Sequence, residues 1–211
     1  MRLIDTHSHL FLEEFSEDFP QVIERARAAG VTHIFMPNID STTIEAMLSA
    51  CSLYKGYCFP MIGLHPTSVN ANYEKELEIV ARELKFSKEY VAIGEIGMDL
   101  YWDKTYLKAQ QIVLDKQVNW ALEYDLPVVI HCRDAFDYIY KVLEPYKKTP
   151  LKGIFHSFTG TAEEATRVLE FSDFFIGING VVTFKKSHLP EILAGIPLEK
   201  IVLETDSPYL T

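Results

Sequence analysis

The sequence predicts an α/β fold, a (β/α)8 barrel of the TIM type that lacks its last helix. Two observations carry this prediction. Short runs rich in β-branched and aromatic residues alternate with longer amphipathic stretches along all 211 residues. Eight of these runs begin at intervals of roughly 20 to 40 residues, which is the length of a βα unit, and eight such units close into a parallel barrel. No linker or low-complexity segment interrupts the alternation, so we expect residues 1–211 to form a single domain.

The expected strands and helices follow one another in strict alternation. The strand segments are 2–5, 32–37, 58–63, 91–95, 128–131, 153–156, 174–178 and 201–204. The helix segments lie near 17–29, 41–54, 73–86, 105–124, 134–146, 161–171 and 187–194. We expect Ser41, Thr105 and Thr161 to be N-caps, because their hydroxyls can accept from the free N–H groups of a first turn. Gly30 should end the first helix and Pro127 the longest one.

The longest helix carries one apolar stripe. Leu107, Leu114, Val118 and Ala121 recur at spacings of seven, four and three, so they share one face, and the other faces are polar. This pattern is typical of a helix that packs one side against a core.

An open doubly wound sheet also alternates strands and helices, but it typically has a glycine-rich phosphate loop after its first strand. Here the first strand runs into Asp5-Thr6-His7-Ser8-His9, which is poorly suited to cradle a phosphate and well suited to bind a metal. The first loop therefore favours the barrel.

Composition excludes several classes of protein. Thirty acidic against 20 basic side chains give a formal net charge of −10, which argues against holding nucleic acid by bulk positive potential. Apolar runs such as 192–196 are far shorter than a membrane span, and no secretory leader is visible. Three cysteines without Cys-x-x-Cys spacing indicate neither a disulfide framework nor a thiolate zinc site. We expect a cytoplasmic monomer with no membrane contact.

Residues that can bind metal gather where strands end. In a barrel the carboxyl ends of the strands form the functional face. A lone histidine is more often a hydrogen-bonded core residue than a ligand. A random distribution of histidines and carboxylates along the chain, however, would not place so many of them at the ends of strands. The rim candidates are His7, His9, His65, Glu95, His131, His156, Glu204 and Asp206.

His7 and His9 carry the sharpest local argument. Strand side chains alternate, so residues two apart point the same way, and both imidazoles should project into the mouth of the barrel. Glu204 and Asp206 share this spacing, so at least one of them should face the mouth, although Asp206 could instead cap a loop.

Glu95 ends an apolar strand with no basic residue nearby, and a buried carboxylate of this kind needs a cation or a set of backbone amides. With a cation, its two oxygens can touch two ions, so we expect Glu95 to bridge them.

Other residues near the rim leave alternatives open. Cys132 is more typical of a small buried side chain than of a ligand. Arg133 is either an anion contact or a solvated residue at a helix start. Tyr101, Trp102 and Phe158 could stack on bases or pack in the core.

The rim residues sit in an ordered set of motifs that resembles the TatD family of metal-dependent deoxyribonucleases, over residues 1–211. The motifs are Asp5-Thr6-His7-Ser8-His9, Gly63-Leu64-His65-Pro66, Gly94-Glu95-Ile96-Gly97-Met98-Asp99, Ile130-His131-Cys132-Arg133, His156-Ser157-Phe158-Thr159-Gly160 and Glu204-Thr205-Asp206-Ser207-Pro208-Tyr209. Any one of them is weak, but six in order are specific.

The resemblance implies two divalent ions and hydrolysis of phosphodiester bonds in DNA. It implies that His7, His9 and Asp206 hold one ion, that His131 and His156 hold the other, and that Glu95 is shared. His65 would contact the scissile phosphate or its leaving group. Ser157 replaces a cysteine frequent in relatives, which should be neutral. Relatives also continue past the last strand, so we expect a C-terminally truncated chain rather than a naturally short one.

The chemistry expected of such a site is attack by a hydroxide that two metals activate, with Asp206 taking the proton and His65 or a water protonating the leaving oxygen. Mixed imidazole and carboxylate ligands suit Zn²⁺ or Mn²⁺, and the resemblance makes Mg²⁺ plausible. The acidic chain should then hold DNA through the metals, as short or single-stranded ends.

Two other functions remain open at this point. An amidohydrolase or an aminoacyl-tRNA deacylase could use the same dinuclear site, although many amidohydrolases bridge their metals with a modified lysine where this chain has Glu95. A non-catalytic module that binds metal or nucleic acid is the third possibility.

Overall fold

Eight parallel strands form the centre of the molecule in the computed structural model, which describes residues 1–209. They are β1 (Leu3–Asp5), β2 (Val31–Pro37), β3 (Cys58–Met61), β4 (Ile93–Asp99), β5 (Val128–Arg133), β6 (Gly153–Phe155), β7 (Phe174–Ile178) and β8 (Ile201–Leu203). Hydrogen bonds order them as β1-β2-β3 and β4-β5-β6-β7-β8.

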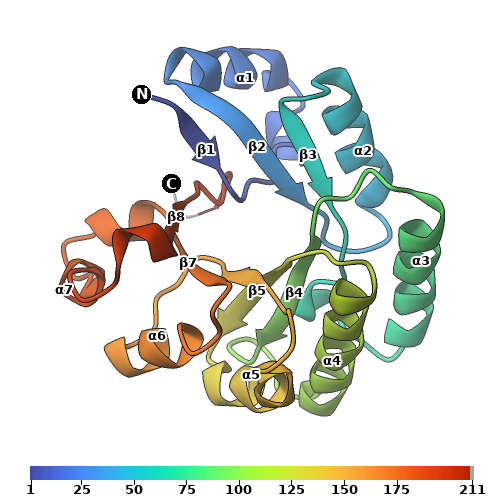
Figure 1. Ribbon diagram of the computed structural model, residues 1–211. Coiled ribbons are helices and arrows are strands. Elements are labelled where there is room, and N and C mark those ends of the chain that lie inside the picture. The colour runs from blue at the N-terminus through green and yellow to red at the C-terminus, as the bar shows by residue number, and fades with distance from the viewer. Residues whose placement is uncertain (210–211) are drawn as a thin grey trace.

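Two seams join these sheets into a barrel. Ser8 bridges to Ser207 beyond the ends of β1 and β8, and Ile62 bridges to Ile93 between β3 and β4, both in parallel sense. Strands therefore neighbour one another in sequence order all the way round (Figure 1). The predicted (β/α)8 fold is confirmed.

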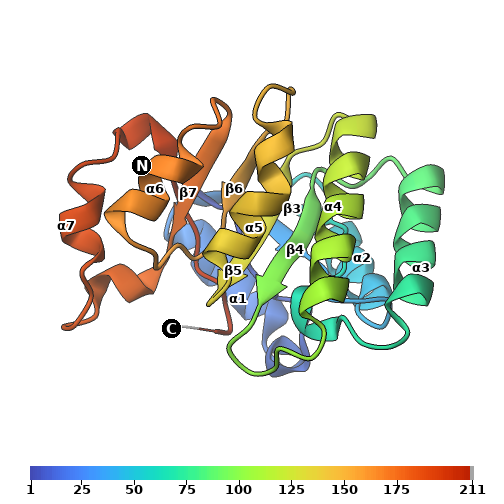
Figure 2. The ribbon, with the colours of Figure 1, turned by 90° about the horizontal axis from the view of Figure 1, so that it is seen from below.

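The helices form the outer layer. They are α1 (Phe19–Ala28), α2 (Ile44–Leu53), α3 (Tyr73–Phe86), α4 (Leu107–Glu123), α5 (Phe136–Leu143), α6 (Ala162–Val168) and α7 (Leu189–Leu193). Short 3-10 helices lie at Glu13–Phe15, Pro66–Ser68, Glu144–Tyr146, Gly180–Thr183 and Leu198–Lys200. Figure 2 shows α4, α5 and α6 standing along the outside of the strands. Up to residue 209 no helix follows β8, and none of the helices in this part of the chain is long and apolar enough to cross a membrane.

Burial follows the apolar pattern of the sequence. On α4, Leu114, Val118 and Ala121 are at most 1% exposed and Leu107 is half-buried, so the predicted stripe does face the core. All seven residues of β4 are buried, as expected for a parallel strand covered on both faces.

One predicted helix cap forms and two do not. The Thr161 hydroxyl accepts from the third N–H of α6 in a capping box, as predicted. Ser41 instead donates its N–H and hydroxyl to Glu76, and Thr105 donates both to Asp103. Because these side chains are held by other groups, α2 and α4 begin two to three residues later, and these two predictions were wrong.

The ends of two helices show what stops them. Gly30 has φ +92° just after α1, where a side chain would be strained, so its predicted role is confirmed. The longest helix, α4, ends at Glu123, before Pro127, because Asp125 turns the chain with φ +53°. The helix thus ends within one residue of its predicted end and ahead of Pro127, and the turn itself is made at Asp125.

The fourth strand runs past its expected end. We predicted that it stops at Glu95, but β4 continues to Asp99 by pairing with β5. Glu95 is therefore an interior residue of the strand rather than its last one, and Asp99 reaches the rim.

Candidate metal centre

His7 and His9 lie just beyond β1 and turn their rings to one point. Their Nε2 atoms are 3.1 Å apart, and both side chains are buried. The extended chain is held there by backbone bonds, since the N–H of His9 donates to Ser207 and the N–H of Asp206 donates to the carbonyl of His7. The side chains of His7 and His9 therefore point the same way, as their two-residue spacing predicted, although both residues lie beyond the end of β1.

The Glu95 carboxylate stands at the centre of the histidines. Its Oε2 atom lies 3.1 Å from Nε2 of His7 and 3.5 Å from Nε2 of His9. On its other side, Oε1 lies 3.0 Å from Nδ1 of His131 and 3.5 Å from Nε2 of His65. The two oxygens thus face two separate sets of imidazoles.

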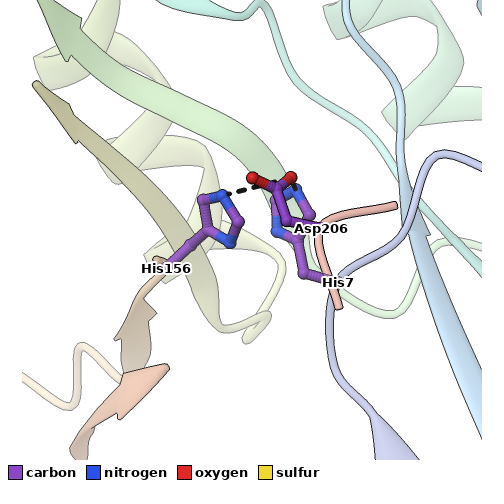
Figure 3. Close-up of side chains that lie close together, drawn as sticks. All are labelled: His7, His156 and Asp206. Atoms are coloured by element: carbon purple, nitrogen blue, oxygen red, sulfur yellow. Dashed lines mark ion pairs between the residues drawn. The ribbon is translucent and has the colours of Figure 1, made fainter. Parts of the chain in front are cut away.

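Asp206 and His156 complete the group next to His7 (Figure 3). The Oδ1 atom of Asp206 lies 3.6 Å from Nε2 of His156 and 3.8 Å from Nε2 of His7. The rings of His7 and His156 are stacked, with centroids 3.4 Å apart. Asp206 reaches this position with φ +61°, a backbone conformation that non-glycine residues rarely adopt.

Three overlapping sets of donor atoms can each hold a cation. Within each set the atoms lie within 4.8 Å of one another: His7, His156 and Asp206; His7, His9 and Glu95; His65, Glu95 and His131. Every predicted ligand belongs to at least one set. His65, which was predicted to contact the phosphate rather than a metal, also belongs to one of these sets. His156 shares a set with His7, although the two were predicted to hold different ions.

Burial and neighbouring charges shift the pKa values of the ionisable groups in the cluster. Burial, together with the neighbouring His156, lowers the pKa of His7 to about 3. Burial alone would also lower the pKa of His156, but Glu204, Glu95 and Asp206 raise it to about 10. Burial raises the pKa of Asp206 to about 6.

The donor set fits a divalent cation. Three atoms, Nε2 of His7, Nε2 of His9 and Oε2 of Glu95, face one another at 3.1 to 3.5 Å. A shared proton can satisfy one pair of these atoms, whereas a cation about 2.0 to 2.2 Å from each satisfies all three. Ligands this far from a common ion stand about 3 to 4 Å apart, which matches the spacing found here.

Four more carboxylates support the metal centre or belong to it: Asp5, Asp99, Glu204 and Asp206. Only Glu204 and Asp206 were among the candidate residues predicted from the sequence. Asp5 accepts from the N–H groups of His7 and Thr205. Asp99 lies 3.0 Å from Nε2 of His131, and Glu204 lies 3.0 Å from Nδ1 of His156. The spacing of Glu204 and Asp206 predicted that at least one faces the mouth; Asp206 does, whereas Glu204 is buried against His156. Asp5 and Asp99 were missed, and the signal for them was an acidic residue in the same sequence motif as a predicted ligand.

Two glutamines of α4 were also missed. The side-chain amide of Gln117 donates to the carbonyl of Leu64 and its oxygen accepts from the same residue, next to His65. Gln110 brackets the backbone of Asp99 in the same way. These hydrogen bonds join α4 to the segment after β3 and to the end of β4. The sequence signal for the two glutamines was a polar residue within the apolar face of the helix.

A cavity of about 660 Å³ opens over the cluster. Its walls include most of the predicted site: His9, His65, Glu95, His131, His156 and Asp206. His7 lies behind them, fully buried. Cys132 also lines the cavity, and burial raises the pKa of its thiol to about 12, so it is not poised as a nucleophile. Among the described residues, His33 and His188 neither belong to the three donor sets nor line the cavity.

Comparison with known proteins places the chain in a family. Residues 4–211 match the family model for TatD-related DNases. An uncharacterised metal-dependent hydrolase of Bacillus subtilis, YabD, is 36% identical over 99% of this chain and 81% of its own length. A 3'-5' ssDNA/RNA exonuclease, TatD, of a Pantoea species is 34% identical over 99% of the chain and 80% of its own length.

A solved structure agrees with the sequence relatives. The crystal structure of YjjV, a TatD homologue from Escherichia coli, superposes with a TM-score of 0.91 at 32% identity, over 99% of this chain and 80% of the other. The resemblance drawn from the six motifs is thus confirmed, and the chain belongs to the TatD family of metal-dependent hydrolases.

Proposed function

We propose that this protein hydrolyses phosphodiester bonds in single-stranded DNA with two divalent cations, as an exonuclease. The observation that carries the proposal is the position of Glu95, whose two oxygens face two different groups of imidazoles. Nuclease relatives support the substrate class, and the ordered motifs support the residue roles. Mg²⁺, Mn²⁺ and Zn²⁺ are the candidate ions, because imidazole and carboxylate ligands accept all three.

Six residues would hold the ions. Glu95 would be shared, and the remaining ligands would be His7, His9, His131, His156 and Asp206. When bound, two such cations make water a stronger acid and neutralise charge on the phosphate oxygens.

Asp206 has the properties of a general base. Its carboxylate lines the cavity and lies beside His7, His9 and His156, so it can accept a proton from a water held there. We assign it the proton of the attacking water.

His65 is better suited to donate a hydrogen bond than to act as an acid. Its Nδ1 atom accepts from the N–H of Thr67, so a neutral ring carries its proton on Nε2, which is directed towards Glu95. Burial lowers the pKa of His65, which keeps the ring neutral near pH 7. We therefore assign His65 to a phosphate oxygen, with an ordered water protonating the leaving group.

A substrate panel tests the proposal. Protein stripped with EDTA and restored with each metal is assayed on a single-stranded oligodeoxynucleotide, dihydroorotate and D-aminoacyl-tRNA. We expect metal-dependent shortening of the oligonucleotide and a loss of at least about a hundredfold in His156→Ala. His188→Ala, a histidine outside the site, is the matched control and should keep full activity.

The panel also separates the rival functions. Turnover of dihydroorotate or of the aminoacyl ester without DNA cleavage would contradict the nuclease assignment and favour the other hydrolases. Two bound ions without hydrolysis of any substrate would favour a binding module.

A further inference from the structure

The cavity over the metal centre is poor in permanent positive charge. Among the described residues that line it, Arg133 is the only arginine or lysine, whereas Glu95, Asp99 and Asp206 contribute carboxylates. In the described lining, a substrate with several phosphates therefore meets one permanently charged basic side chain, that of Arg133.

Arg133 contacts aromatic rings, and its charge also acts on the neighbouring Asp99, whose pKa it helps to lower, without forming an ion pair with it. It is the last residue of β5, and its guanidinium carbon lies 3.9 Å from the ring centroid of Tyr101 and 5.4 Å from that of Trp102. Within residues 1–209 its guanidinium makes neither a hydrogen bond nor an ion pair with another side chain. These ring contacts position the guanidinium while its N–H donors remain available to a ligand.

Trp102 offers a flat apolar surface at the same place. The side chain lines the cavity and is 74% exposed, and its ring meets that of Tyr101 edge-on with centroids 4.8 Å apart. Phe158, the third aromatic that the sequence placed near the rim, is 6% exposed and packs in the core. Of the three, Phe158 is thus excluded as a stacking surface, and Trp102 is the one that faces the cavity.

We propose that Arg133 and Trp102 form a nucleotide-binding subsite beside the metal centre. Arg133 binds the phosphate that neighbours the scissile one, and Trp102 stacks on one unpaired base. This inference rests on the proposed phosphodiesterase function and adds to it the reason for a single-stranded substrate. A base inside a duplex is already stacked on both faces, whereas an unpaired base can lie on an indole ring.

The subsite also fits the net charge of the chain. The formal charge of −10 argues against holding DNA by a broad basic surface. One bidentate arginine and one stacking ring hold a single nucleotide locally, which suits a strand engaged near its end.

Abasic substrates test the subsite. The wild type, Trp102→Ala, Arg133→Gln and Phe86→Ala are assayed on a single-stranded oligonucleotide and on strands in which one of the three nucleotides nearest the cleaved bond lacks its base. Phe86, 77% exposed at the end of α3 and outside the cavity lining, is the matched aromatic control.

We expect Trp102→Ala to lower kcat/KM on the intact strand by about 5- to 150-fold, the range of one base-aromatic stack. At one of the three abasic positions, wild type and Trp102→Ala should become equal. Arg133→Gln should lower kcat/KM by about tenfold or more on every strand, because it binds phosphate, and Phe86→Ala should change nothing.

Two results would overturn the subsite while leaving the proposed function intact: full activity of both variants on the intact strand, or an equal loss in Trp102→Ala on intact and on all abasic strands. A wild-type protein that cleaves none of these strands would instead contradict the nuclease function itself.

Discussion

The Nε2 atom of His131 lies 3.0 Å from Oδ2 of Asp99. Because a carboxylate can only accept, Nε2 of the ring donates to Asp99, and a cation held between the ring and Glu95, which lies 3.0 Å from Nδ1, would take the unprotonated Nδ1. Asp99 is itself fixed, since its Oδ1 atom accepts from the N–H of Tyr101. Asp99 therefore sets both the tautomer and the orientation of His131.

Asp99→Asn should weaken metal binding by about ten- to a hundredfold, the usual effect of removing a carboxylate that orients a histidine ligand. An amide has one accepting oxygen and cannot satisfy both the Tyr101 N–H and the His131 ring. Titration calorimetry of the metal-free protein measures the change. Asp103→Asn, which alters an exposed carboxylate bonded to Thr105, should bind like wild type, and equal affinity of the two variants would refute the positioning role.

Removing metal should lower the thermal stability of the protein. A ligand present at a hundred times its dissociation constant stabilises the fold by about 2.7 kcal/mol per site. For a chain of this size that amounts to a fall in Tm of roughly 5 to 10 °C per site on chelation. Differential scanning calorimetry with and without EDTA measures the shift. The same Tm in both conditions would show that the buried cluster binds no ion tightly.

Gly97→Ala should destabilise the barrel by more than about 2 kcal/mol. Gly97 has φ +139°, and an added Cβ would lie 2.0 Å from the carbonyl oxygen of His131 in the neighbouring strand. Gly56→Ala is the control, because Gly56 also has a positive φ but has no atom within 4 Å of an added Cβ. It should cost only about 1 kcal/mol. Urea unfolding measures both, and equal losses would show that no clash occurs.

Thr161→Ala should cost about 1 kcal/mol of unfolding free energy, because the hydroxyl caps α6. Thr105→Ala should cost less than about 0.5 kcal/mol, since Thr105 caps no helix. The same urea experiment compares them. A larger loss in Thr105→Ala would contradict the placement of the α4 start.

Strand order and the rim residues could be predicted from the sequence because both depend on local patterns. Apolar runs locate the strands, and a parallel barrel brings their carboxyl ends together whatever the details of packing. The course of β4 could not be predicted in this way. Glu95 and Gly97 look like the end of a strand, but inside the barrel Glu95 meets imidazoles and Gly97 makes room for the backbone of His131.

The roles of the supporting residues depend on contacts between distant segments. Asp5 meets Thr205, 200 residues away, and Gln117 meets Leu64, 53 residues away. No period or spacing encodes such a pairing. The cap predicted at Ser41 fails for the same reason, because Ser41 has a partner in Glu76 from another helix.

The bridging position of Glu95 is the centre of the proposed mechanism, and metal stoichiometry tests it most directly. Wild type and Glu95→Gln are equilibrated with Mn²⁺ or Zn²⁺, dialysed and measured by inductively coupled plasma mass spectrometry. We predict two ions per wild-type chain and at most one in Glu95→Gln, because the amide cannot serve both sets of imidazoles. Two ions retained in Glu95→Gln, or a single ion in wild type at saturation, would contradict the shared carboxylate.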